Sequence, residues 1–238
     1  MGLLALAIAP GIAICIYIYF KDKYKKEPFG LLLFSFVLGM ISIIPAILME
    51  LPFGKLMQQM EVQSSWKVAI YAFLVVGFSE EISKYFMVRF FAFKRMAFDD
   101  PFDGIVYSVM VGMGFATLEN IGYVYQHGMG TGIVRMFMSV PAHATFAVLM
   151  GYHIGLAKFD PAHKTRHLFY AILWPVLFHG AFDFFLFKGN TLLHVAGAIT
   201  SFFIAIKLSR RAIRKKLVLS ENHYKGIDVI TNQDHSLL

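Results

Sequence analysis

The sequence predicts an all-α, polytopic integral membrane protein, a bundle of about seven transmembrane helices. Of its 238 residues, 58% are hydrophobic and 16% are charged, and the mean hydropathy is +0.62. Soluble globular domains are roughly half apolar and about a quarter charged. Spanning ~30 Å of hydrocarbon takes about 20 apolar residues. Seven stretches qualify: 2–20, 29–49, 67–88, 102–125, 132–156, 168–187 and 192–208.

The first stretch is expected to be a retained helix and not a cleaved signal peptide. No basic region precedes it, and a lysine cluster follows it. The chain has one cysteine, Cys15, which lies in this stretch. A single cysteine excludes disulfides and cysteine-based zinc sites within one chain.

Lysine and arginine are distributed unevenly over the predicted loops. Most of the 22 lie in alternate loops, after the first, third, fifth and seventh stretches. Cytoplasmic loops carry such an excess, so we expect the N-terminus outside and the C-terminus in the cytoplasm. The same rule explains the net charge of +7. The positive charge therefore gives no reason to expect a nucleic-acid partner. The expected partner of the protein is the lipid bilayer.

The chain is predicted to form one polytopic membrane domain over residues 1–216. Residues 217–238 are polar and aperiodic and are expected to be a flexible cytoplasmic tail. Pro45 predicts a kink in the second span. The polar link over 50–66 is expected to be an outer loop or an interfacial helix.

Several ionisable side chains lie inside the predicted spans. A charge near the bilayer centre costs about 3 kcal/mol on insertion scales, so such groups should face the bundle interior and serve a function. At 1.5 Å per residue, their depths overlap in the middle to outer half of the bilayer. They come from four spans: Glu80, Glu81 and Lys84; Glu119 with Asn120; His143; and His179 with Asp183.

Local spacing suggests roles for these residues. Glu80 and Lys84 are four residues apart, so we expect an ion pair, with Glu81 pointing elsewhere on the helix. His179 and Asp183 share the same spacing, so the carboxylate can orient the imidazole. Adjacent carboxylates disfavour double ionisation, which suits one of them to general base catalysis. Water activation by a glutamate, with imidazoles or a metal stabilising an oxyanion, is chemistry that this set can perform.

These residues alone leave several interpretations open. A proton-coupled transporter also uses intramembrane Glu, His and Lys. His143 and His179 could ligate a haem in an electron carrier. The Glu80–Lys84 pair could also be purely structural and serve to fix the register of its helix. No His-Glu-x-x-His motif is present, which argues against a zincin-type protease.

Four ordered motifs closely resemble the PrsW family of bacterial membrane proteases. They are Phe-Ser-Glu-Glu-Ile-Ser-Lys (78–84), Gly-Phe-Ala-Thr-Leu-Glu-Asn (114–120), Pro-Ala-His-Ala (141–144) and Phe-His-Gly-Ala-Phe-Asp-Phe (178–184). Asp-Gly-Ile-Val-Tyr (103–107) and Glu27-Pro28 look like the same family. The resemblance covers residues from about 9 to 216.

The resemblance implies a membrane-embedded endopeptidase in the bacterial cytoplasmic membrane. Its substrate would be a single-span membrane anti-sigma factor such as RsiW, cut first on the extracytoplasmic side. That cut would release a sigma factor for the envelope-stress response. Glu80 or Glu81 would activate water, with His143 and His179 stabilising the oxyanion or holding a metal.

The resemblance also completes the expected site. Glu119 joins the catalytic set, and Lys84, Asn120 and Asp183 support it. Zinc is a possible cofactor that the sequence does not require; its candidate ligands are Glu119, His143 and His179.

The wider group of CAAX- and bacteriocin-processing membrane proteases is also similar. Its pattern is Glu-Glu-x-x-x-Arg, then Phe-x-x-x-His, then His-x-x-x-Asn or Asp. Here Tyr85 stands where arginine is usual. Glu119 takes the histidine position after Phe115. His143 is therefore expected to supply the missing imidazole.

Overall fold

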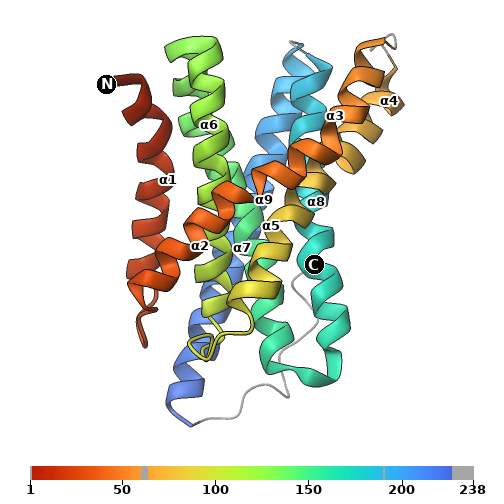
Figure 1. The fold of residues 1–238 in the computed structure, drawn as a ribbon. Coiled ribbons are helices and arrows are strands. Elements are labelled where there is room, and N and C mark those ends of the chain that lie inside the picture. Colours follow the sequence, from red (N-terminus) through yellow and green to blue (C-terminus); the bar gives the residue numbers. More distant parts are fainter. Residues whose placement is uncertain (1, 60–63, 190, 227–238) are drawn as a thin grey trace.

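The computed structural model describes residues 2–59, 64–189 and 191–226, and these ranges form helices joined by short connections, without a strand (Figure 1). The all-helical prediction is confirmed. The elements are α1 (Gly2–Lys21), α2 (Phe29–Ile41), α3 (Ile43–Gln59), α4 (Ser65–Ile70), η1 (Tyr71–Gly77), α5 (Phe78–Met87), η2 (Val88–Ala92), α6 (Asp103–Phe137), α7 (Ser139–Phe159), η3 (Pro161–His163), α8 (Lys164–Lys188) and α9 (Leu192–Tyr224).

Within the described residues, five helical stretches are long and apolar enough to cross a membrane, as judged by length and composition. They are Gly2–Lys21, Phe29–Gly54, Asp103–Phe159, Pro161–Lys188 and Leu192–Tyr224. The third contains both α6 and α7. The run from α4 to η2 is not among them, and it carries Glu80, Glu81 and Lys84. Each predicted span falls on helix, but seven crossings and the orientation remain predictions.

Helix α6 is the centre of the bundle. It packs against α1, α2 and α7, and nearly every residue of its first half is buried. Helices α2 and α3 together cross the face of the bundle obliquely (Figure 1). The main core cluster gathers residues of α1, α5, α6, α7 and α9 around this helix.

Glycines let α6 approach its neighbours backbone to backbone. A Cβ on Gly104 would lie 2.4 Å from the carbonyl oxygen of Gly151 in α7. A Cβ on Gly114 would lie 1.9 Å from the carbonyl oxygen of Phe36 in α2. Small residues at helix crossings are the usual means of tight packing between membrane helices.

The predicted kink of the second span lies slightly upstream of Pro45. Helix α2 ends at Ile41 and α3 begins at Ile43. This break places Pro45 in the first turn of α3, where its missing N–H needs no intrahelical partner. Helix α3 then continues to Gln59, so the first part of the link expected over 50–66 continues the second span as helix. Residues 60–63 lie outside the described ranges.

Helix α9 extends beyond the predicted seventh span and through the first residues of the predicted tail. It ends at Tyr224, not at Leu208. Ala212, Lys216 and Ser220 are buried at four-residue spacing, so one face of this basic stretch packs on the bundle. The seventh span is predicted from the length of the apolar stretch, so its predicted end lies where charged residues begin. The helix itself continues beyond that point. Residues 227–238, the rest of the predicted tail, lie outside the described ranges.

Candidate active site

Helix α5 carries the two glutamates and the lysine between two π-helical segments, η1 and η2. Such segments add a residue to a helical turn and occur often at functional sites. Helix α8 comes close to η1 at Gly180, where a Cβ would lie 2.8 Å from the Cα of Phe73. This contact brings His179 alongside Glu81.

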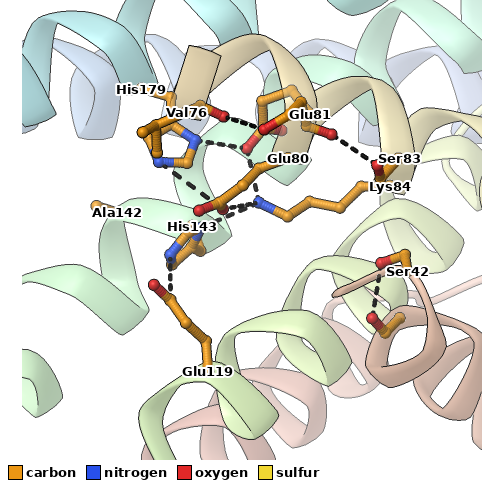
Figure 2. A network of polar contacts seen from close by, with 12 residues as sticks. Ser42, Val76, Glu80, Glu81, Ser83, Lys84, Glu119, Ala142, His143 and His179 are labelled. Atoms are coloured by element: carbon orange, nitrogen blue, oxygen red, sulfur yellow. Dashed lines mark hydrogen bonds and ion pairs between the residues drawn. The ribbon is translucent and has the colours of Figure 1, made fainter. Parts of the chain in front are cut away.

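The ammonium of Lys84 contacts three other side chains of the site (Figure 2). Its Nζ donates to Glu80 Oε2 at 3.0 Å and to Glu81 Oε1 at 2.8 Å. It also lies 3.2 Å from His143 Nδ1. The predicted Glu80–Lys84 pair is present. The expectation that Glu81 points elsewhere is wrong, because residues three apart on a helix also share a face.

The imidazole of His179 connects α8 to the carboxylates around Lys84. Its Nδ1 lies 2.8 Å from Glu81 Oε1 and its Nε2 lies 3.3 Å from Asp183 Oδ2. The ring stacks on Phe146, with centroids 5.0 Å apart. Each ring nitrogen faces a carboxylate, an arrangement that is fully satisfied when both nitrogens carry a proton. The predicted pairing of His179 with Asp183 is therefore present.

The imidazole of His143 connects Lys84 to Glu119. Its Nε2 lies 3.0 Å from Glu119 Oε2. An ammonium can only donate, so Nδ1 accepts from Lys84 and Nε2 carries the proton that is donated to Glu119. The rings of His143 and His179 meet edge to face, with centroids 5.1 Å apart. His143 thus contributes an imidazole to the site, as expected from the sequence.

Arg135 also belongs to the site, although its position in the sequence does not predict this. Its Nη2 donates to Glu119 Oε2 at 2.7 Å, and its Nε donates to Asn120 Oδ1 at 3.0 Å. Asn120 in turn donates to the carbonyl oxygen of Ala7 in α1. Gly128, with φ of 80°, interrupts α6 between Glu119 and Arg135. The glycine was the one available signal, because it marks a break before the arginine.

A second missed residue is Glu50 of α3. Ser79, next to Glu80, donates its hydroxyl to Glu50 Oε1 at 2.7 Å. The apolar stretch ends just before Glu50, so the sequence predicts an outer loop or an interfacial helix from this residue onward. The continued helix instead carries its carboxylate to α5.

All the residues assigned to the site from the sequence lie in one connected network of contacts: Glu80, Glu81, Lys84, Glu119, Asn120, His143, His179 and Asp183. Its four carboxylates face two permanent cations, Lys84 and Arg135, together with two imidazoles. The charges therefore nearly compensate in a buried setting. Glu80, Glu81 and Lys84 are almost completely inaccessible to solvent.

The site also holds a donor set that suits a metal. Glu80, Glu81, His143 and His179 each offer one atom, and these atoms lie within 4.8 Å of one another. Two imidazole nitrogens and two carboxylate oxygens are ligands that zinc accepts. Glu119, a predicted metal ligand, lies outside this group. The ammonium of Lys84 lies among the donors, so a bound ion would share the glutamates with it or displace it.

Fold and site together define a class of protein: a multi-pass helical membrane protein with a glutamate- and histidine-lined site inside the bundle, the arrangement of an intramembrane protease. The sequence profile described as "PrsW family intramembrane metalloprotease" matches residues 27–208. The chain belongs to this family. Membership decides between the interpretations that the intramembrane charges left open, in favour of a membrane protease over a transporter or an electron carrier.

Curated relatives support the assignment over most of the chain. Protease PrsW of Geobacillus kaustophilus is 39% identical over 78% of this chain and 80% of its own length. Protease PrsW of Bacillus subtilis is 38% identical over 78% and 83%. Protease PrsW of Clostridioides difficile is 33% identical over 95% and 94%. No solved structure matches the chain.

Proposed function

We propose that this protein makes the first, extracytoplasmic-side cut in a single-span membrane anti-sigma factor in the bacterial cytoplasmic membrane. The cut would release an extracytoplasmic-function sigma factor for the envelope-stress response. The observation that carries the proposal is the buried network around Lys84, built from residues of the four family-like motifs. Its position supports the side of the cut: His179 lies about 14 Å from the end of α8 at Lys188, the end predicted to lie outside.

Glu80 is the proposed general base. Its side chain is 7% exposed, whereas that of Glu81 is 1% exposed. Glu81 is also held twice, by Lys84 and by His179 through the same oxygen. Glu81 therefore suits a positioning role, and Glu80 is the carboxylate that a water molecule reaches more readily.

In the proposed reaction, Glu80 takes a proton from water while the water oxygen bonds to the peptide carbonyl carbon. His143 stabilises the resulting oxyanion through its Nε2–H, which Glu119 holds in the free enzyme. The C–N bond then breaks, and the proton on Glu80 passes to the leaving amine. A zinc ion held by Glu81, His143 and His179 would supply Lewis acidity in this site and leave Glu80 as the base.

A co-expression assay in a heterologous bacterial membrane tests the proposal. The substrate is an anti-sigma factor tagged at both ends, and the enzymes are wild type, Glu80→Gln and Glu81→Gln. We expect a cytoplasm-tagged fragment, shortened on its outer side, with wild type only. Both variants should lose stability, because each weakens a buried pair with Lys84 although the glutamine oxygen still accepts a hydrogen bond. Glu81→Gln should lose more than Glu80→Gln, because its contact with His179 also loses its charge.

Normal cleavage by Glu80→Gln would refute the assignment of the base. Normal cleavage by both variants would refute the site. A fragment shortened on the cytoplasmic side would contradict the proposed topology of the cut. Cleavage of an unrelated single-span protein, but of no anti-sigma factor, would overturn the substrate class while leaving the protease intact.

A further inference from the structure

A second polar cluster lies at the other end of α6. Asp103 begins this helix, and Glu119 of the active site lies about 24 Å further along it at 1.5 Å per residue. The cluster contains five carboxylates: Asp22, Glu27, Asp99, Asp100 and Asp103. Two of them belong to the family-like motifs that the active site does not use, Glu27-Pro28 and Asp-Gly-Ile-Val-Tyr. The fold therefore joins two distant sequence motifs at this end.

Three of these carboxylates converge. Glu27, Asp99 and Asp103 each offer one oxygen, and the three oxygens lie within 4.8 Å of one another. Glu27 is 3% exposed and Asp103 is 0% exposed. They come from separate segments, namely the connection before α2, the turn before α6, and the start of α6.

Each of the three has a partner at one of its oxygens. The hydroxyl of Tyr107 donates to Glu27 Oε2, and Lys25 Nζ contacts Asp99 Oδ2. The backbone N–H groups of Asp99 and Asp100 donate to Asp103 Oδ2 at 2.9 and 2.7 Å. These bonds fix the carboxylates in place before any ligand arrives.

Within the described part of the chain, the remaining oxygens have no partner. Glu27 Oε1, Asp99 Oδ1 and Asp103 Oδ1 are buried there without a hydrogen bond. Buried polar atoms are nearly always satisfied, so three unpaired oxygens from three converging side chains need an explanation. A single bound cation would satisfy all three oxygens at once.

Few of the surrounding cations form ion pairs with these carboxylates. Among the described residues, the exposed Lys25–Asp99 contact is the only ion pair that the five carboxylates form. The ammonium of Lys26 contacts the carbonyl oxygens of Tyr19 and Asp22, and that of Lys158 donates to the carbonyl oxygen of Phe93.

A further buried cation faces the edge of the cluster. Lys216 Nζ has no hydrogen-bond partner among the residues that the structure describes, and it interacts electrostatically with Asp100, outside the converging three. Among the described residues, Glu27 and Asp103 therefore form no ion pair, and Asp99 is paired only with the exposed Lys25.

We propose that Glu27, Asp99 and Asp103 bind a hard divalent cation of the Mg²⁺ or Ca²⁺ class. Carboxylate oxygens without nitrogen or sulfur donors select such ions over zinc. The ion ties the α1–α2 connection to the start of α6, the central helix of the bundle. This site is independent of the proposed substrate and of the active-site chemistry.

The test is thermal unfolding of the purified full-length protein in detergent, after chelator treatment, with added Mg²⁺ or Ca²⁺. We expect a saturable rise in Tm of roughly 5–10 °C when the cation is 100-fold above its Kd. Glu27→Gln and Asp103→Asn should abolish the rise. Asp160→Asn, a carboxylate at the same end that contacts His163 and His167, should keep it.

His179→Ala separates the two candidate metal sites. This variant should keep the full response to Mg²⁺ or Ca²⁺, because it changes only the active-site donors. Asp103 also holds the backbone of the preceding turn, so Asp103→Asn can fail to fold. In that case Glu27→Gln decides, together with Mn²⁺ bound to wild type and displaced by Mg²⁺ or Ca²⁺ in electron paramagnetic resonance.

No rise in wild type with either cation would overturn the proposal, as would an equal rise in Glu27→Gln. Protons shared between the carboxylates are the competing explanation. Under that explanation stability rises as the pH is lowered and does not respond to the cation, and this result too would overturn the proposal.

Discussion

Replacing Lys84 by methionine removes the buried ammonium that donates a hydrogen bond to both Glu80 and Glu81. Methionine keeps the length and apolar stem of the side chain but leaves two adjacent carboxylates without this shared donor. Because the three residues are almost completely buried, water cannot compensate. We therefore expect Lys84→Met to lower stability strongly, in addition to abolishing cleavage.

The geometry sets the magnitude. Two unit charges about 3 Å apart attract by roughly 5–6 kcal/mol at an effective dielectric constant of about 20, and Lys84 makes two such contacts, at 3.0 and 2.8 Å. Breaking a buried pair by removing one partner costs about 3–5 kcal/mol in practice. At about 2–4 °C per kcal/mol for a chain of this size, Tm should fall by roughly 6–20 °C.

The assay is thermal unfolding in detergent of four proteins: wild type, Lys84→Met, Lys84→Met with Glu80→Gln, and Lys23→Met. The double variant should recover part of the loss, because it removes one uncompensated charge. Lys23 is exposed, and its substitution should change stability by no more than about 0.5 kcal/mol. A Tm for Lys84→Met close to that of Lys23→Met, or a double variant less stable than the single one, would refute the reasoning.

Three further predictions concern the site and its packing. Arg135→Gln should lower kcat/KM about 10- to 100-fold, because a hydrogen bond to a charged group contributes about 1.5–3 kcal/mol. Arg135→Lys should keep part of the kcat/KM that Arg135→Gln loses, and equal rates for wild type and both variants in proteoliposomes would contradict this. Gly39→Val should reduce folded yield and Tm, because a Cβ there would lie 2.0 Å from the Val111 carbonyl oxygen, whereas Gly30, with nothing within 4 Å, should tolerate valine. Metal analysis should find zinc in purified wild type and not in His143→Ala, and fully active zinc-free wild type would exclude a catalytic zinc.

The membership of the site could be predicted from the sequence because buried charge is costly in a membrane. Glu80, Glu81 and His179 stand out inside apolar stretches, and this alone is enough to predict that they converge. The contacts among them could not be predicted. Which carboxylate His179 contacts most closely depends on the rotation of α5 against α8, which the spacing of residues along one helix does not determine.

Arg135 shows a different limit of the sequence. A basic residue near the end of an apolar stretch is typical of a loop charge, so its position alone gives no reason to place it in the site. Its contacts with Glu119 and Asn120 arise only because α6 is broken at Gly128. The full length of α9 could not be predicted for a related reason. A stretch of apolar residues identifies the part of a helix that can cross the membrane, and α9 continues into charged sequence beyond that part.

The π-helical segment η1 makes the active site depend on backbone hydrogen bonding as well as on residue identity. A π turn holds one residue more than an α turn, and each residue turns an α-helix by about 100°. Regular α-helix over the same residues, Tyr71–Gly77, would therefore turn Glu80 and Glu81 about a quarter-turn away from His179 without removing a single catalytic group. The alignment of the site thus depends on a segment that carries no catalytic residue.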